Sequence, residues 1–189
     1  YDSIAANAGT GYGLASICIA HYRGWTSYND AYYKVLNVLK TFRDKLARGP
    51  QGFSHHFYAV VGQWYNNQYY NGYIPAGGKI LDDPNFYSVI DHALFVSGAI
   101  FAGQYFKGTE VEQIAQQLYR DSDWTYGTGE YNPATKEFNG IVGAEYITCN
   151  VLASGSPTHS LDAKYGAGHA KAAWNEASGA PYNESVSLY

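Results

Sequence analysis

The chain of 189 residues has no methionine, including at position 1, so we expect a processed chain or an excerpt of a longer one. Charged residues make up only 15% of it, and the net charge is −4. That balance argues against nucleic acid as a main partner. No run of 18 or more apolar residues appears, which predicts no membrane span, and no signal peptide is visible.

Cysteine is nearly absent. Cys18 and Cys149 are the only two, and both fall in apolar runs that are typical of helices. Two cysteines are too few for a disulfide framework and lack the spacing of metal ligands. We therefore expect buried packing residues, with one long-range disulfide as the open alternative. We expect neither a metal nor a cofactor.

Tyrosine, in contrast, is abundant, with 20 residues, and aromatic residues reach 17%. Aromatic rings combined with little charge suit a surface that meets sugars or other proteins, because each ring is flat and apolar and tyrosine adds a polar tip. The alternative is a tyrosine-rich core with tyrosine-rich loops.

Apolar periodicity predicts an all-α fold. In the clearest helix Ser27 is the N-cap, and Gly49-Pro50 is expected to end it. A capping box at Thr109–Glu112 opens another helix. Long Gly, Tyr and Asn-rich connections separate the helices, and the first contains a candidate hairpin at residues 57–70. The expected helices cover residues 12–23, 28–48, 86–106 (apolar nearly all round and therefore buried), 110–121 and 143–154.

The segment LASGSPTHSLDAKYGAGHAKAAW, residues 152–174, holds His159 and His169 among small residues. A histidine in such a run can face an oxyanion. The cations needed to pair that anion should then follow downstream, yet no Arg or His occurs after His169. We therefore expect His169 to bind neither phosphate nor vanadate.

Several ordered blocks resemble the glycoamylase-like family, which includes enzymes active on β-1,2-glucan. The resemblance covers about residues 11–174. It is carried by GLASICIAHYRGW, YKVLNVLKTFRDKL, GFSHHF, VIDHALFVSGAIFAGQYFKGTEVEQIAQQLYRDSDWTY and GSPTHSLDAKY. It implies an (α/α)6 toroid of helical hairpins with a sugar cleft at one end. Because only five or six helices are expected here, residues 1–189 would form a single, incomplete domain, either a fragment or a part completed by another chain.

The resemblance implies that Asp91 and Glu145 match acidic positions of the family, and glycosidases use such paired carboxyls. Each has a plainer alternative: Asp91 as a helix-start residue that accepts backbone N–H groups, and Glu145 as an exposed helix residue. Two positions depart from the family pattern, Ser88 and the Gly143-Ala144 pair before Glu145.

Four further residues are expected to bind sugar: His56, Trp124, Tyr126 and His159. His56 and Trp124 have alternatives as packing residues. Two hypotheses follow. The first is an extracellular or periplasmic glycoside hydrolase or transglycosylase acting on a β-glucan, with an oligo- or polysaccharide as its partner. The second is a non-catalytic extracellular assembly subunit, which would form a homo-oligomer.

Overall fold

The computed structural model describes residues 4–59, 63–65, 68–70, 74–75, 87–125, 131–132, 134, 137–138 and 144–161. The chain forms two compact units, Tyr1–Ser122 and Asp123–Tyr189. Tyr126, His169 and Trp174 lie outside the described residues, as does the side chain of Glu145.

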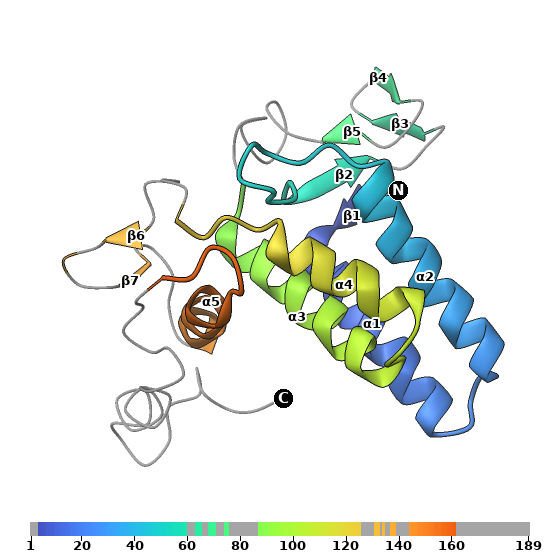
Figure 1. Ribbon diagram of the computed structural model, residues 1–189. Coiled ribbons are helices and arrows are strands. Elements are labelled where there is room, and N and C mark those ends of the chain that lie inside the picture. The colour runs from blue at the N-terminus through green and yellow to red at the C-terminus, as the bar shows by residue number, and fades with distance from the viewer. Residues whose placement is uncertain are drawn as a thin grey trace, which may run out of the picture. The chain divides into compact units, whose positions relative to one another are not determined.

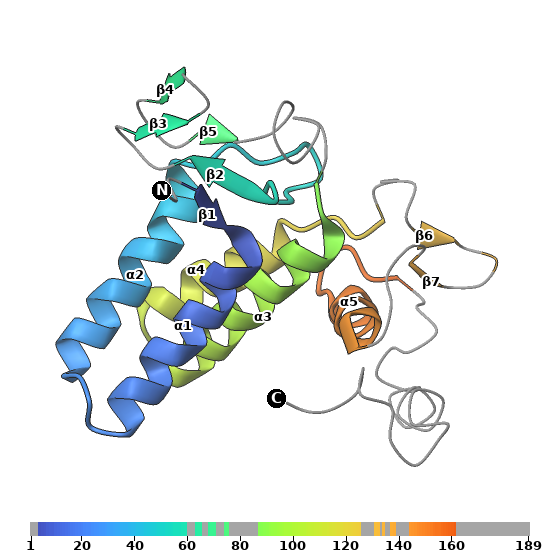
Figure 2. The same cartoon turned by 180° about the vertical axis from the view of Figure 1, so that it is seen from behind.

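Two helical hairpins build the first unit. One consists of α1 (Asn7–Tyr22) and α2 (Tyr28–Asp44), the other of α3 (Val89–Tyr105) and α4 (Glu110–Arg120). Figures 1 and 2 show α1 and α3 side by side and running in the same direction, while α2 and α4 run back. A fifth helix, α5, belongs to the second unit. The five helices of the described chain confirm the predicted all-α class with helical hairpins.

The residue pattern of each helix explains its place. α3 is apolar nearly all round and buries most of its side chains, as predicted. α2 and α4 each carry one apolar stripe and turn their polar faces to solvent. The core therefore lies between α1 and α3 and beneath the stripes of α2 and α4. Its largest fully buried aliphatic and aromatic side chains include Leu14, Leu39, Phe95, Phe106, Ile114 and Leu118.

Glycine permits the close approach of α1 to α3. A Cβ atom added to Gly11 would lie 2.3 Å from the carbonyl oxygen of Leu94, and one added to Gly98 would lie 2.1 Å from that of Gly11. Both distances are far inside van der Waals contact. The two backbones consequently touch, and no other residue fits at either position.

The predicted starts of α2 and α4 are confirmed, whereas α1 begins five residues earlier than predicted, at Asn7, and α3 begins three residues later, at Val89. Ser27 caps α2 by accepting the backbone N–H of Asp30 at 3.1 Å. At α4, Thr109 accepts from Val111, whereas Glu112 accepts the N–H of Gly108 instead of that of Thr109. The capping box is therefore shifted by one residue at each end.

The predicted end of α2 near Gly49-Pro50 is wrong. The helix stops at Asp44, and the N–H groups of Lys45 and Leu46 both donate to the carbonyl of Thr41. Leu46 turns into the core, where it is buried. Burial of this side chain fixes an earlier turn than the Gly-Pro signal indicates.

Short strands lie at the end of the first unit where α1 and α3 begin (Figure 1). β1 (Ile4–Ala6), β2 (Phe57–Ala59) and β5 (Ile74–Pro75) form an antiparallel sheet in the order β1-β2-β5. The candidate hairpin at 57–70 is present only in its second half, where β3 (Gln63–Tyr65) pairs with β4 (Gln68–Tyr70). β2 instead pairs with β1, a partner distant in sequence.

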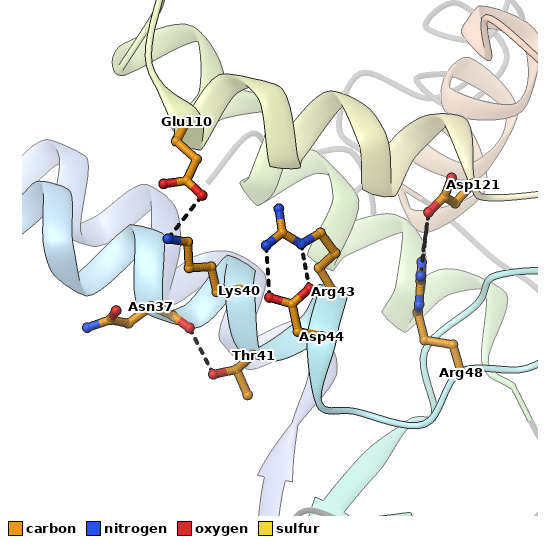
Figure 3. Close-up of polar contacts among 8 residues, drawn as sticks. All are labelled: Asn37, Lys40, Thr41, Arg43, Asp44, Arg48, Glu110 and Asp121. Carbon is orange, nitrogen blue, oxygen red and sulfur yellow. Dashed lines mark hydrogen bonds and ion pairs between the residues drawn. The ribbon is translucent and has the colours of Figure 1, made fainter.

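Three ion pairs on the first unit appear in Figure 3. Lys40 of α2 pairs with Glu110 of α4 at 3.0 Å, and Arg48 reaches Asp121 at 3.4 Å. The third joins Arg43 to its neighbour Asp44 within α2. All three lie near solvent, where such pairs contribute little to stability, and only Lys40–Glu110 joins α2 to α4.

The second unit contains β6 (Tyr131–Asn132) paired with β7 (Glu137–Phe138), followed by α5 (Ala144–Gly155). α5 buries Cys149, Leu152 and Ala153. Cys18 and Cys149 are both buried, as predicted. Among the described residues, no helix is long and apolar enough to cross a membrane.

We expect Gly11→Ala to lower the free energy of unfolding by about 1–3 kcal/mol, because the added methyl group must push α1 away from α3. The matched control is Gly13→Ala in the same helix, where an added Cβ atom meets nothing within 4 Å. Alanine should raise stability there by about 0.5–1 kcal/mol. Urea unfolding of both variants checks the pair; equal effects of the same sign would contradict the close-packing argument.

Candidate active site at the start of α3

A buried loop brings the candidate residues together. After α2 the chain turns through residues 48–56, held by bonds from the Gly49 N–H to the Phe53 carbonyl and from the Gly52 N–H to the Gly49 carbonyl. Gly52 has a φ of +79°, and a Cβ atom there would lie 2.1 Å from the carbonyl oxygen of Asp121. Glycine is thus required for this loop to pack against the end of α4.

The side chain of Tyr58 joins two points of the loop by hydrogen bonds. Its hydroxyl accepts the N–H of His55 at 2.9 Å and donates to the carbonyl of Ala47 at 2.9 Å. Burial raises the pKa of Tyr58 to about 12, so the hydroxyl keeps its proton and remains a donor. The ring of His55 packs on Tyr87, with centroids 4.5 Å apart, and burial lowers the pKa of His55.

His92, the residue after Asp91, is buried and has a structural role. Its Nδ1 accepts the N–H of Ser54 at 3.1 Å, and its Nε2 lies 2.8 Å from Oγ of Ser122. That hydroxyl donates to the carbonyl of Leu118, so it must accept from Nε2–H of His92. The ring is therefore the neutral Nε2–H tautomer. Burial, with a smaller contribution from Arg48, lowers the pKa of His92 to about 3.

His56 and Asp91 meet at the same end of the unit. Nε2 of His56 lies 3.4 Å from Oδ2 of Asp91, and their side chains are 26% and 17% exposed. The backbone of His56 is fixed by the N–H of Asn7, which donates to the His56 carbonyl at 2.9 Å. The first turns of α1 and α3 therefore hold this histidine–carboxylate pair between them, partly open to solvent.

Ser88 orients the carboxylate. Its hydroxyl accepts the N–H of Asp91 as the N-cap of α3, and donates to Oδ2 of Asp91 in a short bond. Oδ2 thus faces both Ser88 and His56, whereas no polar contact to Oδ1 is found among the described residues. One oxygen is held, and the second can reach a ligand.

The same capping arrangement occurs at the start of α2, where Ser27 donates to Oδ2 of Asp30 at 2.8 Å. Asp30 is exposed and belongs to no buried cluster. Asp91 does lie in the first turn of α3, as the capping alternative requires, but its carboxylate accepts the hydroxyl of Ser88, and no backbone N–H to it is found among the described residues. Partial burial and the neighbouring His56 distinguish Asp91 from an ordinary capping residue.

The other predicted residues belong to the second unit. Trp124 is 1% exposed, so its ring would need its surroundings to open before it could stack on a sugar. The backbone N–H of the half-buried His159 donates to Oγ of Ser156 at 3.1 Å, in the Gly-Ser-Pro-Thr-His turn. Glu145 lies in the first turn of α5. The sugar-binding roles, and the shared cavity of Asp91 and Glu145, remain predictions.

Sequence reasoning missed two groups of residues. His92 looked like a neighbour of the candidate acid, and only its buried partners reveal its structural role. Asn7 and Gln51 are buried polar residues, and within the described chain both side-chain polar atoms of Asn7 and Oε1 of Gln51 lack a hydrogen-bond partner. No sequence pattern signals them, since burial of an isolated amide depends on distant segments.

A separate pocket of about 310 Å³ lies between α1, α2 and β2. Thr10, Thr41 and Asn37 line it beside Phe42, Leu46 and Tyr58, and neither His56 nor Asp91 takes part. This pocket and the histidine–carboxylate pair are therefore different places on the first unit.

The paired helical hairpins have the fold of a partial helical toroid. No family model and no curated protein matches the sequence. The fold occurs in the endo-β-1,2-glucanase of Chitinophaga pinensis, solved with sophorotriose and glucose, with a TM-score of 0.62, 17% identity, and coverage of 84% of this chain and 38% of that one.

Two further solved structures share the fold. The β-1,2-glucanase of Parabacteroides distasonis has a TM-score of 0.64 at 16% identity, over 84% of this chain and 23% of that one. A "putative glucoamylase" of Bacteroides fragilis has a TM-score of 0.60 at 19% identity, over 84% and 38%. The resemblance to glycoamylase-like proteins is confirmed in the fold. This chain spans well under half the length of each of these proteins, consistent with a partial toroid.

The depressed pKa of His92 predicts an acid-sensitive fold. Below about pH 6.5 this histidine is protonated in the unfolded chain, whereas in the folded chain it becomes protonated only near pH 3. Stability is therefore present above pH 6.5 and lost as pH falls, by up to about 1.4 kcal/mol per pH unit. Urea unfolding at pH 7 and pH 5 should show a steeper loss for the natural protein than for His92→Gln. His55 is present in both proteins, so its contribution to the pH dependence cancels in the comparison. The same pH dependence in both proteins would contradict a buried, neutral His92 ring.

Proposed function

We propose that the chain is part of a carbohydrate-active protein, a glycoside hydrolase or transglycosylase acting on a β-glucan through Asp91 and Glu145. The observation that carries this is the carboxylate of Asp91, half-buried beside His56 at the start of an apolar helix, in a fold shared with β-1,2-glucanases. A carboxylate in such a place is costly unless it is partnered or used.

The chemistry needs two carboxyl groups with different tasks. One carboxylic acid protonates the leaving oxygen of the glycosidic bond, and the other carboxylate activates water or attacks the sugar. Oδ2 of Asp91 accepts a hydroxyl and faces an imidazole, contacts that suit the carboxylate that activates water or attacks the sugar. Glu145 is then the acid, since an apolar run follows it from Tyr146 to Ala153.

The remaining assignments follow from this proposal. His56 would contact the sugar or hold Asp91, while Trp124, Tyr126 and His159 would contribute to sugar binding. A carboxyl separation of about 6.5–9.5 Å would favour inversion of the anomeric centre, and one of about 5–5.5 Å retention. A polysaccharide substrate also favours an extracellular or periplasmic location, because such polymers are met outside the cytoplasm.

A second candidate function is a non-catalytic assembly subunit. The observation that favours it is apolar surface on α1 and α3, where Ile19 of α1 and Phe101 of α3 are exposed. Exposed apolar patches mark association surfaces. In this version further helical hairpins, from another chain or from a longer form of this one, would cover these side chains.

We expect Asp91→Asn to lower kcat for β-1,2-glucan cleavage by about 10²–10⁴-fold, the usual contribution of a general acid or base. Asp30→Asn is the matched control, because it alters the same Ser–Asp capping motif on α2 and should leave kcat unchanged. Reducing-end assays, with thermal unfolding of both variants, check this prediction.

Glu145→Gln should reduce cleavage to a similar degree. Unchanged cleavage after both carboxyl substitutions would end the catalytic proposal. Absence of cleavage by the unaltered protein, together with its self-association in sedimentation velocity, would support the assembly subunit instead.

A further inference from the structure

An exposed group of aromatic side chains lies where α1 ends and α2 begins. Tyr22 and Trp25 are each 77% exposed, and Tyr28 and Tyr33 are about half exposed. We refer to these four residues as the aromatic corner. α1 has 16 residues and spans roughly 24 Å, and the His56–Asp91 pair lies at its other end. The aromatic corner is therefore separate from the candidate active site.

Backbone geometry fixes Trp25 in place. Gly24 has a φ of +73°, its N–H donates to the carbonyl of His21, and the N–H of Trp25 donates to that of Ala20 at 2.8 Å. These two bonds and the left-handed glycine form a Schellman motif, which ends a helix with a defined turn. The backbone at Trp25 therefore has a defined conformation after the end of α1, and its ring is exposed to solvent.

Ring packing fixes Tyr28. It stacks on Tyr32 with centroids 6.0 Å apart and an interplanar angle of 6°, and meets the edge of the buried Phe106 at 5.5 Å. His21 touches Tyr28 at 5.5 Å and is itself bonded to the hydroxyl of Tyr105 at 2.7 Å. Packing against the core thus holds the ring of Tyr28 in place before any ligand binds, which reduces the conformational entropy lost on binding.

The chemistry of the corner selects an uncharged, hydroxyl-rich ligand. Between residues 21 and 34 the charged side chains are Arg23, Asp30 and Lys34, all exposed and of mixed sign. An anionic membrane surface is recognised by clusters of about 4–8 basic residues, which this segment lacks. Flat rings with polar tips instead offer apolar area to sugar faces and hydrogen bonds to their hydroxyl groups.

We propose that the aromatic corner is a second, non-catalytic binding site for a neutral polysaccharide chain. Trp25 and Tyr22 provide the most exposed contact area, and Tyr28, at the start of α2, adds a ring held by its packing on Tyr32 and Phe106. The ligand class follows from these side chains and does not rest on the proposed catalytic function. Such a site holds the protein on a polymer while the other end of the helices remains accessible.

The test is affinity electrophoresis in gels that contain soluble β-1,2-glucan, laminarin or hydroxyethylcellulose, with Asp91→Asn as the background so that no polymer is cleaved. We expect retardation by at least one polymer. We also expect Trp25→Ala to weaken binding by about tenfold, equivalent to about 1.4 kcal/mol. Tyr12→Ala is the matched control: its ring is also exposed, about 15 Å from Tyr22 along α1, and its loss should leave retardation unchanged.

Three outcomes would overturn the proposal: no retardation by any polymer, equal losses in Trp25→Ala and Tyr12→Ala, or a dimer in sedimentation velocity that Trp25→Ala dissolves. The last would identify a second copy as the occupant. Failure of the catalytic proposal is distinguishable, because an inactive protein that is retarded through Trp25 leaves this site intact. In an active protein, Trp25→Ala should leave cleavage of short β-1,2-linked oligosaccharides unchanged.

Discussion

The close contact between α1 and α3 is the constraint on which the first unit depends. Gly11 and Gly98 let the two backbones touch, so the helices run side by side and begin at the same end. If either glycine carried a side chain, the helices would separate and the first turns of α1 and α3 would no longer hold the loop at residues 48–56 between them. His56 meets Asp91 because of this contact, although they are far apart in sequence.

The polar groups around that loop divide into two kinds. Tyr58 and His92 are buried, hydrogen-bonded and kept neutral: Tyr58 joins two points of the loop, and His92 fixes the loop to α3 and to the end of α4. His56 and Asp91 are partly open, and within the part of the chain that the structure describes no polar contact engages Oδ1 of Asp91. This division is the arrangement expected of a site, where rigid buried groups position a few accessible ones. It also explains why two adjacent residues, Asp91 and His92, have different roles.

The two candidate sites use opposite ends of the same helices. At one end the helix starts gather titratable groups, and at the other the Schellman turn and a stack of rings present aromatic surface. Both depend on short-range chemistry that the sequence carries, a Ser–Asp capping motif and a Gly-Trp pair after a helix. The contribution of each of these two motifs to function depends on the side chains of other segments that pack against it.

The sequence by itself determined the helices, because apolar periodicity, the Ser27 cap and the apolar character of residues 89–105 act locally or over one turn. It also carried the family-like blocks, and with them the fold. Only the tertiary structure decided where α2 ends, since burial of Leu46 outweighs the Gly-Pro signal, and that β2 pairs with β1. It also decided that Asp91 faces His56 whereas the identical cap at Asp30 faces solvent. The physical reason is that a side chain's burial, and therefore its chemistry, is set by segments distant in sequence, and no local pattern encodes them.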